Sequence, residues 1–301
     1  MSKLQSTTLA KASIWLIPLL WSVNYYVARK APGVIAPYML TLIRWGLAGV
    51  VLTSLSFAEI KAHQKEIKQN LHQFFIFGFC GMVVCGAWVY LGAKSTTAMN
   101  IALIYAAAPV LIAVGSVIWL KEKFRPIQMI GVVIALVGVL HVIVKGQWSA
   151  LSKVQFVIGD AWIVAATLSW ATYSLLQKLW KSSLSGNARL AVITCAALPM
   201  LIVGAIWEQF QPNTPPLSLY GVMLAAAAAI FPGILAYLVY SWAQQLIGAS
   251  KVAITFYLGP LYAALIAWLL LDEHLYAFHL QAALLILPGV YFVSQAKPKS
   301  A

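Results

Sequence analysis

The chain has 301 residues, of which 62% are hydrophobic and only 9% are charged, and its mean hydropathy is +0.86. This balance excludes an ordinary soluble protein and predicts an all-α integral membrane protein, because apolar runs of about 20 residues recur with only short polar breaks. The three cysteines lie inside apolar runs, so a disulfide framework is not expected.

Ten membrane-spanning helices are predicted in chain order, at about 12–29, 36–57, 72–92, 97–120, 126–144, 156–178, 189–207, 217–243, 250–271 and 276–295. The polar run EIKAHQKEIKQN separates the second helix from the third, and the turn-rich QPNTPP separates the seventh from the eighth. The first apolar run follows Lys3 and Lys11, as a signal peptide would, but no small-residue cleavage site comes after it. We therefore expect a retained first span.

The net charge of +13 is distributed as membrane topology requires. With the amino terminus in the cytoplasm, most Lys and Arg residues fall in loops on the cytoplasmic side, and few fall on the opposite side. The positive-inside rule therefore predicts that both termini are cytoplasmic. Because the basic residues are spread over loop ends and not gathered into one patch, we expect no nucleic-acid partner.

A sequence repeat divides the chain into residues 1–150 and 151–301. Three residues of the first half recur 151 positions later, namely Pro109 as Pro260, Glu122 as Glu273 and Gly138 as Gly289. Each half holds five predicted helices, an odd number, so the second half enters the membrane from the opposite side. The loop KEKFR after the fourth helix is basic and its counterpart DEHLY is acidic, as this inversion requires. We predict two inverted five-helix repeats that together form one transport domain.

The opening helix of each repeat carries an aromatic and polar stripe. Trp21 and Asn24 share one face of the first helix, and Trp170 and Tyr173 share one face of the sixth. Inverted repeats are typical of transporters, whose substrate site lies near the membrane midplane where helices are broken. In the fourth and ninth helices, matched prolines each remove an intrahelical hydrogen bond, which predicts kinks with a role in gating at Pro109 and Pro260.

Arg44 lies inside the second predicted helix, where a charged side chain is costly. Two interpretations remain open: it binds a substrate carboxylate, or it has a structural role and bonds backbone carbonyls or a lipid phosphate. Glu122 and Glu273 stand at loop ends, where we expect them to fix loops. No carboxylate falls clearly in the middle of a span, so we favour downhill or weakly coupled transport, with ion coordination by backbone carbonyls as the alternative.

Several motifs carry a family resemblance that covers nearly the whole chain. They are AAAPVLIAVGSVIWLKEKF followed by QMIGVVIALVGVLHVI, the second copy GASKVAITFYLGPLYAALIAWLLLDEHL followed by LILPGV, the first-helix stretch LLWSVNYYVARK, and LIRWGLAG around Arg44. Together they resemble the EamA-type branch of the drug/metabolite transporter superfamily. The combination is specific to the family and not to a substrate.

The resemblance implies a ten-helix carrier of the bacterial inner membrane that moves amino acids or other small metabolites outward. The residues that it places near the central cavity are Trp21, Asn24, Tyr90, Tyr105, Trp170, Tyr173, Tyr237 and Tyr257. Their aromatic character favours large or aromatic amino acids. We expect no cofactor and no metal. The expected partners are a small-molecule substrate and the lipid bilayer, and a monomer is expected.

Three other functions remain as alternatives. A multidrug or cationic-compound exporter would use the same fold. An intramembrane enzyme is disfavoured, because the serine of GASK lacks a following glycine and His274 and His279 lie on different helical faces. A channel is the third alternative, since inverted repeats also build water channels.

Overall fold

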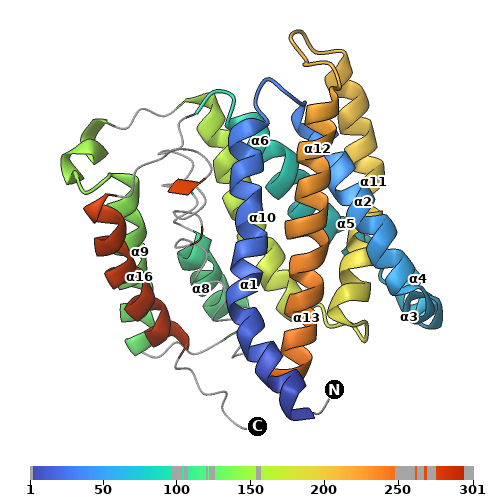
Figure 1. The fold of residues 1–301 in the computed structure, drawn as a ribbon, viewed down its shortest axis with the longest axis horizontal. Coiled ribbons are helices and arrows are strands. Elements are labelled where there is room, and N and C mark those ends of the chain that lie inside the picture. Colours follow the sequence, from blue (N-terminus) through green and yellow to red (C-terminus); the bar gives the residue numbers. More distant parts are fainter. Residues whose placement is uncertain are drawn as a thin grey trace. The chain divides into compact units, whose positions relative to one another are not determined.

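The computed structural model describes residues 3–96, 108–119, 126–153, 157–247 and 276–294, with isolated positions at 104, 121, 262 and 268–269. Every regular element in these ranges is a helix (Figure 1). Two compact units are present. The first unit comprises Met1–Leu91 and Trp180–Asp272, and the second comprises Gly92–Leu179 and Glu273–Ala301.

The first unit holds the helices of the first, second, third, seventh and eighth predicted spans. Their bounds are α1 Lys3–Lys30, α2 Pro37–Leu55, α3 Phe57–Ala62, α4 Gln64–Gln69, α5 Leu71–Gly78, η1 Phe79–Trp88, α6 Val89–Gly92, α11 Gly186–Gln209, α12 Leu219–Ala228, η3 Ala229–Leu235 and α13 Ala236–Ile247. The elements η1 and η3 are π-helical, and each continues the α-helices on either side of it.

The second unit holds the helices of the fourth, fifth, sixth and tenth predicted spans. Their bounds are α8 Ala108–Trp119, α9 Pro126–Ile143, the 3₁₀ turn η2 Trp148–Lys153, α10 Ile158–Leu179 and α16 Ala277–Ser294. The ninth predicted span lies outside the described residues except at isolated positions. Each unit therefore contains helices from both sequence repeats.

Four described helices are both long and apolar enough to cross a bilayer. They are Pro37–Leu55, Leu71–Gly92, Gly186–Gln209 and Leu219–Ala243, which match the second, third, seventh and eighth predicted spans. With 28 and 22 residues, α1 and α10 are also long enough to cross a bilayer. They are not among these four apolar helices, and they carry the aromatic and polar stripes predicted from the sequence. The regular elements that the structure describes are thus all helices, and four of them are suited to cross a membrane, while the total of ten spans remains a prediction.

The helices α2 and α11, which occupy corresponding places in the two repeats, pack against each other in the first unit. Glycines allow their close approach. A Cβ atom at Gly204 would lie 2.2 Å from Tyr38 Cδ1, and one at Gly49 would lie 3.1 Å from Thr194 Cγ2. These contacts join the start of α2 to the end of α11, so the two helices run antiparallel.

The helices α9 and α16 are the corresponding pair in the second unit and lie side by side (Figure 1). A Cβ atom at Gly138 would lie 2.8 Å from Ile286 Cγ1 and 3.1 Å from the Ala282 carbonyl oxygen. Gly138, one of the repeat markers in the sequence, therefore serves helix packing.

Two glutamates cap the paired helices α2 and α11 reciprocally. Glu208, at the end of α11, is 2% exposed, and its Oε2 accepts hydrogen bonds from the backbone N–H groups of Tyr38 (2.9 Å) and Met39 (3.3 Å) at the start of α2. Glu59, just beyond α2, accepts bonds from the N–H (2.5 Å) and hydroxyl (2.8 Å) of Ser185, the residue before α11. A helix N-terminus has free N–H donors and a positive dipole end, so both carboxylates stabilise the pair.

We expect Glu208→Ala to lower the free energy of unfolding by about 1–2 kcal/mol, because it removes the cap of a helix N-terminus. For a chain of this size, the melting temperature in detergent should then fall by several degrees. The matched control is Gln209→Ala, at the adjacent exposed position. Equal melting temperatures for the two variants would contradict a stabilising role for the cap.

Candidate functional site

The helix α1 packs one stripe of residues against α13, which positions its polar face. Ala10 and Ile17 form a buried cluster with Ala243, and Trp21, Val239 and Tyr240 pack against it. The spacing of these α1 residues by seven and then four positions keeps them on one side of the helix. Asn24 follows Trp21 by three positions and is only partly buried.

A polar cluster lies next to this aromatic layer in the first unit. The Arg44 Nη1 of α2 donates a hydrogen bond to Asn24 Oδ1 at 2.9 Å, and the Tyr90 hydroxyl of α6 donates to the same oxygen at 3.4 Å. Arg44 also stacks over the ring of Trp45, with its Cζ 4.7 Å from the ring centroid. Three helices therefore bring their polar side chains to one place.

The hydrogen bonds of Arg44 leave part of its guanidinium available. Its Nε is buried and has no hydrogen-bond partner among the described residues. Its partner Asn24 is a neutral amide, so that bond does not cancel the positive charge. A buried donor without an acceptor costs about 1–3 kcal/mol, which an incoming acceptor would relieve. This part of the cluster is suited to an anionic group.

Aromatic rings lie beside the polar cluster. The ring centroids of Trp21 and Tyr237 are 6.1 Å apart in an edge-to-face arrangement, and those of Trp21 and Tyr240 are 5.8 Å apart. Arg44 lies within electrostatic range of the hydroxyls of both Tyr90 and Tyr237. An apolar aromatic surface thus adjoins a cationic group, as in sites for amphipathic small molecules.

The structure gathers five of the predicted residues into one cluster, namely Trp21, Asn24, Arg44, Tyr90 and Tyr237. Tyr240 was not predicted, although its position three residues after Tyr237 places it on the same helical face. The aromatic stripe of α10 belongs to the second unit, where the rings of Trp170 and Tyr173 stack with centroids 5.6 Å apart.

The remaining predicted residues are less fully described. Tyr105, Tyr257 and Pro260 lie outside the described residues. Pro109 is the second residue of α8, whose preceding turn is also not described, so the matched kinks at Pro109 and Pro260 remain a prediction. Within the described ranges, no three His, Cys, Asp or Glu side chains come together in a way that could hold a metal ion.

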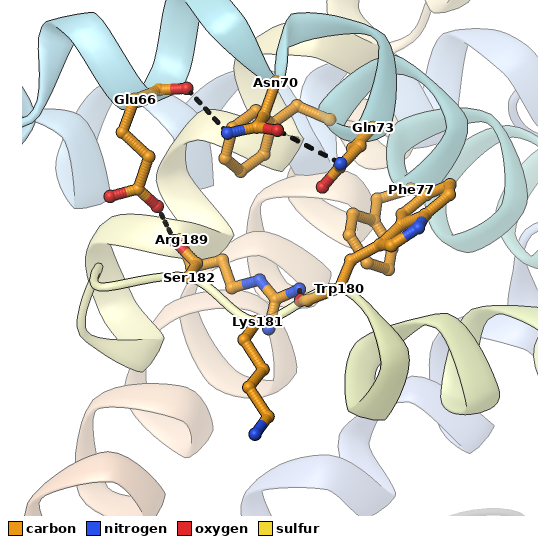
Figure 2. A pocket seen from close by; sticks show the side chains of 9 residues that line it. Glu66, Asn70, Gln73, Phe77, Trp180, Lys181, Ser182 and Arg189 are labelled. Carbon is orange, nitrogen blue, oxygen red and sulfur yellow. Dashed lines mark hydrogen bonds between the residues drawn. The ribbon is translucent and has the colours of Figure 1, made fainter. Parts of the chain in front are cut away.

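A small hollow lies between α4, α5, the start of α11 and the segment before it (Figure 2). Glu66, Phe77, Trp180, Ser182 and Arg189 contribute to its lining. Arg189 donates to the Trp180 carbonyl oxygen at 2.6 Å and lies over the ring of Phe77, so it fixes the chain locally. These contacts favour a structural role for the hollow.

Glu66 anchors the segment that leads into α11. It accepts hydrogen bonds from the Ser183 hydroxyl, from the Ser182 hydroxyl at 2.7 Å, and from the Ser183 N–H at 3.2 Å. The bond from Ser183, followed by that from Ser182, holds the pKa of the Glu66 carboxyl below its usual range. Such a group stabilises the fold above the unfolded pKa, and this stabilisation is lost as pH falls through the folded pKa.

We therefore expect the backbone N–H of Ser183 to exchange with solvent faster, after correction for intrinsic exchange, as the pH falls through the lowered pKa of Glu66. In Glu66→Gln this acid-dependent step should disappear, because the amide does not titrate. Hydrogen exchange with mass spectrometry would measure both proteins, and Glu66→Gln retaining the full step would contradict the assignment.

The comparisons with known proteins identify the family. The model of the EamA-like transporter family matches residues 11–144 and again residues 157–295. The chain belongs to this family. The two matches cover almost the whole sequence as two successive copies of the same unit, so the EamA-like repeat and a transporter fold are established together.

Several known proteins are similar in sequence to this EamA-like chain over most of their length. The uncharacterized transporter YyaM of Bacillus subtilis is 25% identical over 90% of this chain and 88% of its own. Protein PagO of Salmonella typhimurium is 24% identical over 91% of this chain and 88% of its own. A protein of Chlamydia muridarum named an S-adenosylmethionine/S-adenosylhomocysteine transporter is 23% identical over 86% of this chain and 83% of its own. Membership of a family of membrane transporters with bacterial members follows.

A solved crystal structure matches the fold. It superposes with a TM-score of 0.69 at 18% sequence identity and covers 94% of this chain and 96% of the other. At this identity the likeness shows the fold alone.

Proposed function

We propose that this EamA-like protein is a carrier for small metabolites that combine a carboxylate with an apolar or aromatic body. The observation that supports the proposal is the Arg44 cluster: a buried Nε without a hydrogen-bond partner in the described structure, next to Asn24 and Tyr90 and beside the ring of Trp21. Arg44 would bind the carboxylate, Asn24 would hold the guanidinium in place, and the rings would contact the rest of the molecule.

Amino acids and metabolites that contain an amino-acid group are the proposed substrate class, with a preference for large or aromatic ones. The Chlamydia relative is named for S-adenosylmethionine and S-adenosylhomocysteine, both of which combine an amino-acid carboxylate with a large ring system. These compounds therefore belong in the test set together with phenylalanine and tryptophan.

Alternating access by the two inverted repeats is the proposed mechanism. The helix pairs α2 with α11 and α9 with α16 join corresponding members of the two repeats, as expected when the copies are related by an axis in the membrane plane. The positive-inside bias supports an inner-membrane location with both termini in the cytoplasm, and we propose that the protein works outward as a monomer.

Export of cationic drugs is the second candidate, because aromatic rings such as Trp21 and Tyr237 also attract cations. The charge of Arg44 disfavours it, since a cation in the same cluster would be repelled in a medium of low dielectric.

The deciding experiment is counterflow in liposomes that contain the purified protein. Vesicles are loaded with one unlabelled compound at a time, and entry of the same labelled compound is followed. Saturable accumulation of carboxylate-bearing compounds is expected. Accumulation of lipophilic cations alone would overturn the substrate class, and no saturable accumulation of any compound by folded protein would contradict the carrier.

We expect Arg44→Gln to lower exchange of an amino-acid substrate at least tenfold, because the cation that binds the carboxylate is lost; a tenfold change corresponds to about 1.4 kcal/mol. Arg44→Lys should retain more activity than Arg44→Gln, since it keeps the charge but loses the planar fork. The charge-matched control is Lys61→Gln, at an exposed position of α3. If Arg44→Gln exchanges the amino-acid substrate as the wild type does, Arg44 has a purely structural role.

Trp21→Ala and its repeat counterpart Trp170→Ala are expected to impair transport while folded protein remains in the membrane, because both aromatic stripes are proposed to contact substrate. The control is Trp15→Ala, on the same helix as Trp21, where the side chain is 61% exposed. Exchange rates and size-exclusion profiles would be compared. Exchange equal to that of the control in both variants would exclude these residues from the site.

A further inference from the structure

Two π-helical segments occupy corresponding places in the two repeats. The segment η1 spans Phe79–Trp88 in the third predicted helix, and η3 spans Ala229–Leu235 in the eighth. Their first residues, 79 and 229, are 150 positions apart, close to the offset of the sequence repeat. A π-helical turn contains one residue more than an α-helical turn over the same stretch of helix, and such turns occur often at functional sites. The match between the repeats indicates a feature of the shared unit.

Different residues produce the two segments. In η3, Pro232 has no N–H to donate to the Ala228 carbonyl, and its ring excludes the ordinary α-helical contact. In η1, glycines hold both ends against neighbouring helices: a Cβ at Gly78 would lie 3.0 Å from the backbone nitrogen of Ala197, and one at Gly86 would lie 2.9 Å from Thr41 Cγ2. The same irregularity thus coincides with a proline in one repeat and with close glycine contacts in the other.

Both segments lead directly into the candidate site. Tyr90 follows the last residue of η1 by two positions, and Tyr237 follows the last residue of η3 by two positions. The reciprocally capped helix α2, which carries Arg44, contacts both η1 and η3. Tyr90 reaches Asn24 through a long hydrogen bond of 3.4 Å, which is weak and easily broken.

We propose that η1 and η3 are register switches that turn Tyr90 and Tyr237 toward or away from Arg44 during transport. When the extra residue of a π-helical segment passes into the helix that follows, that helix advances by one residue and rotates by about 100°, the angle per residue of an α-helix. This inference rests on the proposed function, because it assigns the motion to the same site. Glu59 and Glu208 hold α2 and α11 as the fixed frame.

Removing one residue tests the switch in η1. Deletion of Cys85, a half-buried residue of η1, lets the segment close as an α-helix while the flanking helices keep their present orientation. The matched control is Cys85→Ala, which keeps the chain length. Both proteins are made with Cys80→Ala and Cys195→Ala, so that neither has a native thiol.

Thiol labelling reads the register without any substrate. Single cysteines are placed at positions 89, 90 and 91 in each protein and labelled with a small charged methanethiosulfonate. The full-length protein should label at two adjacent positions, one for each register. The deletion protein should label rapidly at only one of these two positions, and labelling at the second position should be at least tenfold slower. Identical labelling patterns in the two proteins would overturn the switch.

Transport supplies the second measurement, with labelled phenylalanine in counterflow as the probe. Exchange should fall at least tenfold on deletion of Cys85 and stay near wild type in Cys85→Ala; equal exchange would overturn the proposal. In case the deletion protein does not fold, Pro232→Ala keeps the chain length, restores the missing N–H in η3 and is expected to slow exchange at least tenfold. Wild-type exchange in Pro232→Ala would also overturn it. If wild type exchanges no compound, the proposed function fails, and the labelling still decides the switch.

Discussion

The antiparallel pairing of α2 with α11 is the constraint on which the first unit depends. Its close approach requires glycine at positions 49 and 204, where any side chain would meet the facing helix. Its ends are held by carboxylates, each of which satisfies N–H donors at the start of the partner helix. Glu208 is buried, so its charge has been taken out of water; the helix N-terminus that it caps offsets much of that cost.

This rigid pair explains how a charged residue can persist in the interior. Arg44 lies on α2, six positions after Tyr38, which contacts Gly204 of α11, and the helix presents it to Asn24 of α1 and Tyr90 of α6. The amide and the ring of Trp45 partly replace the water that the guanidinium has lost. What they leave unmet, the Nε donor and the net charge, is the basis on which we propose that the cluster binds an anion. In this proposal the feature that costs stability is also the one that provides recognition.

The sequence predicted this cluster better than it predicted the geometry around it. Trp21 and Asn24 could be assigned to one face because helical spacing alone decides that. Arg44 could be singled out because a charge in an apolar run is costly. The partnership of Arg44 with Asn24, and the approach of Tyr240 to Trp21, could not be predicted, because each joins helices whose relative rotation depends on packing. The π-helical segment η1 escaped prediction for the same reason, since the glycines near its two ends, Gly78 and Gly86, lie close against distant helices.

The sequence by itself determined the class of protein, the internal repeat and the family, because hydrophobic run length, loop charge and residue spacing are local properties that need no partner. The tertiary structure alone decided which repeated features share a unit: Trp21 joins Tyr237 and Tyr240, while Trp170 and Tyr173 belong to the other unit. It also decided that Glu59 and Glu208 act as caps, since each bonds a residue more than a hundred positions away. Such pairings arise from the packing of whole helices, and no local pattern in the chain encodes them.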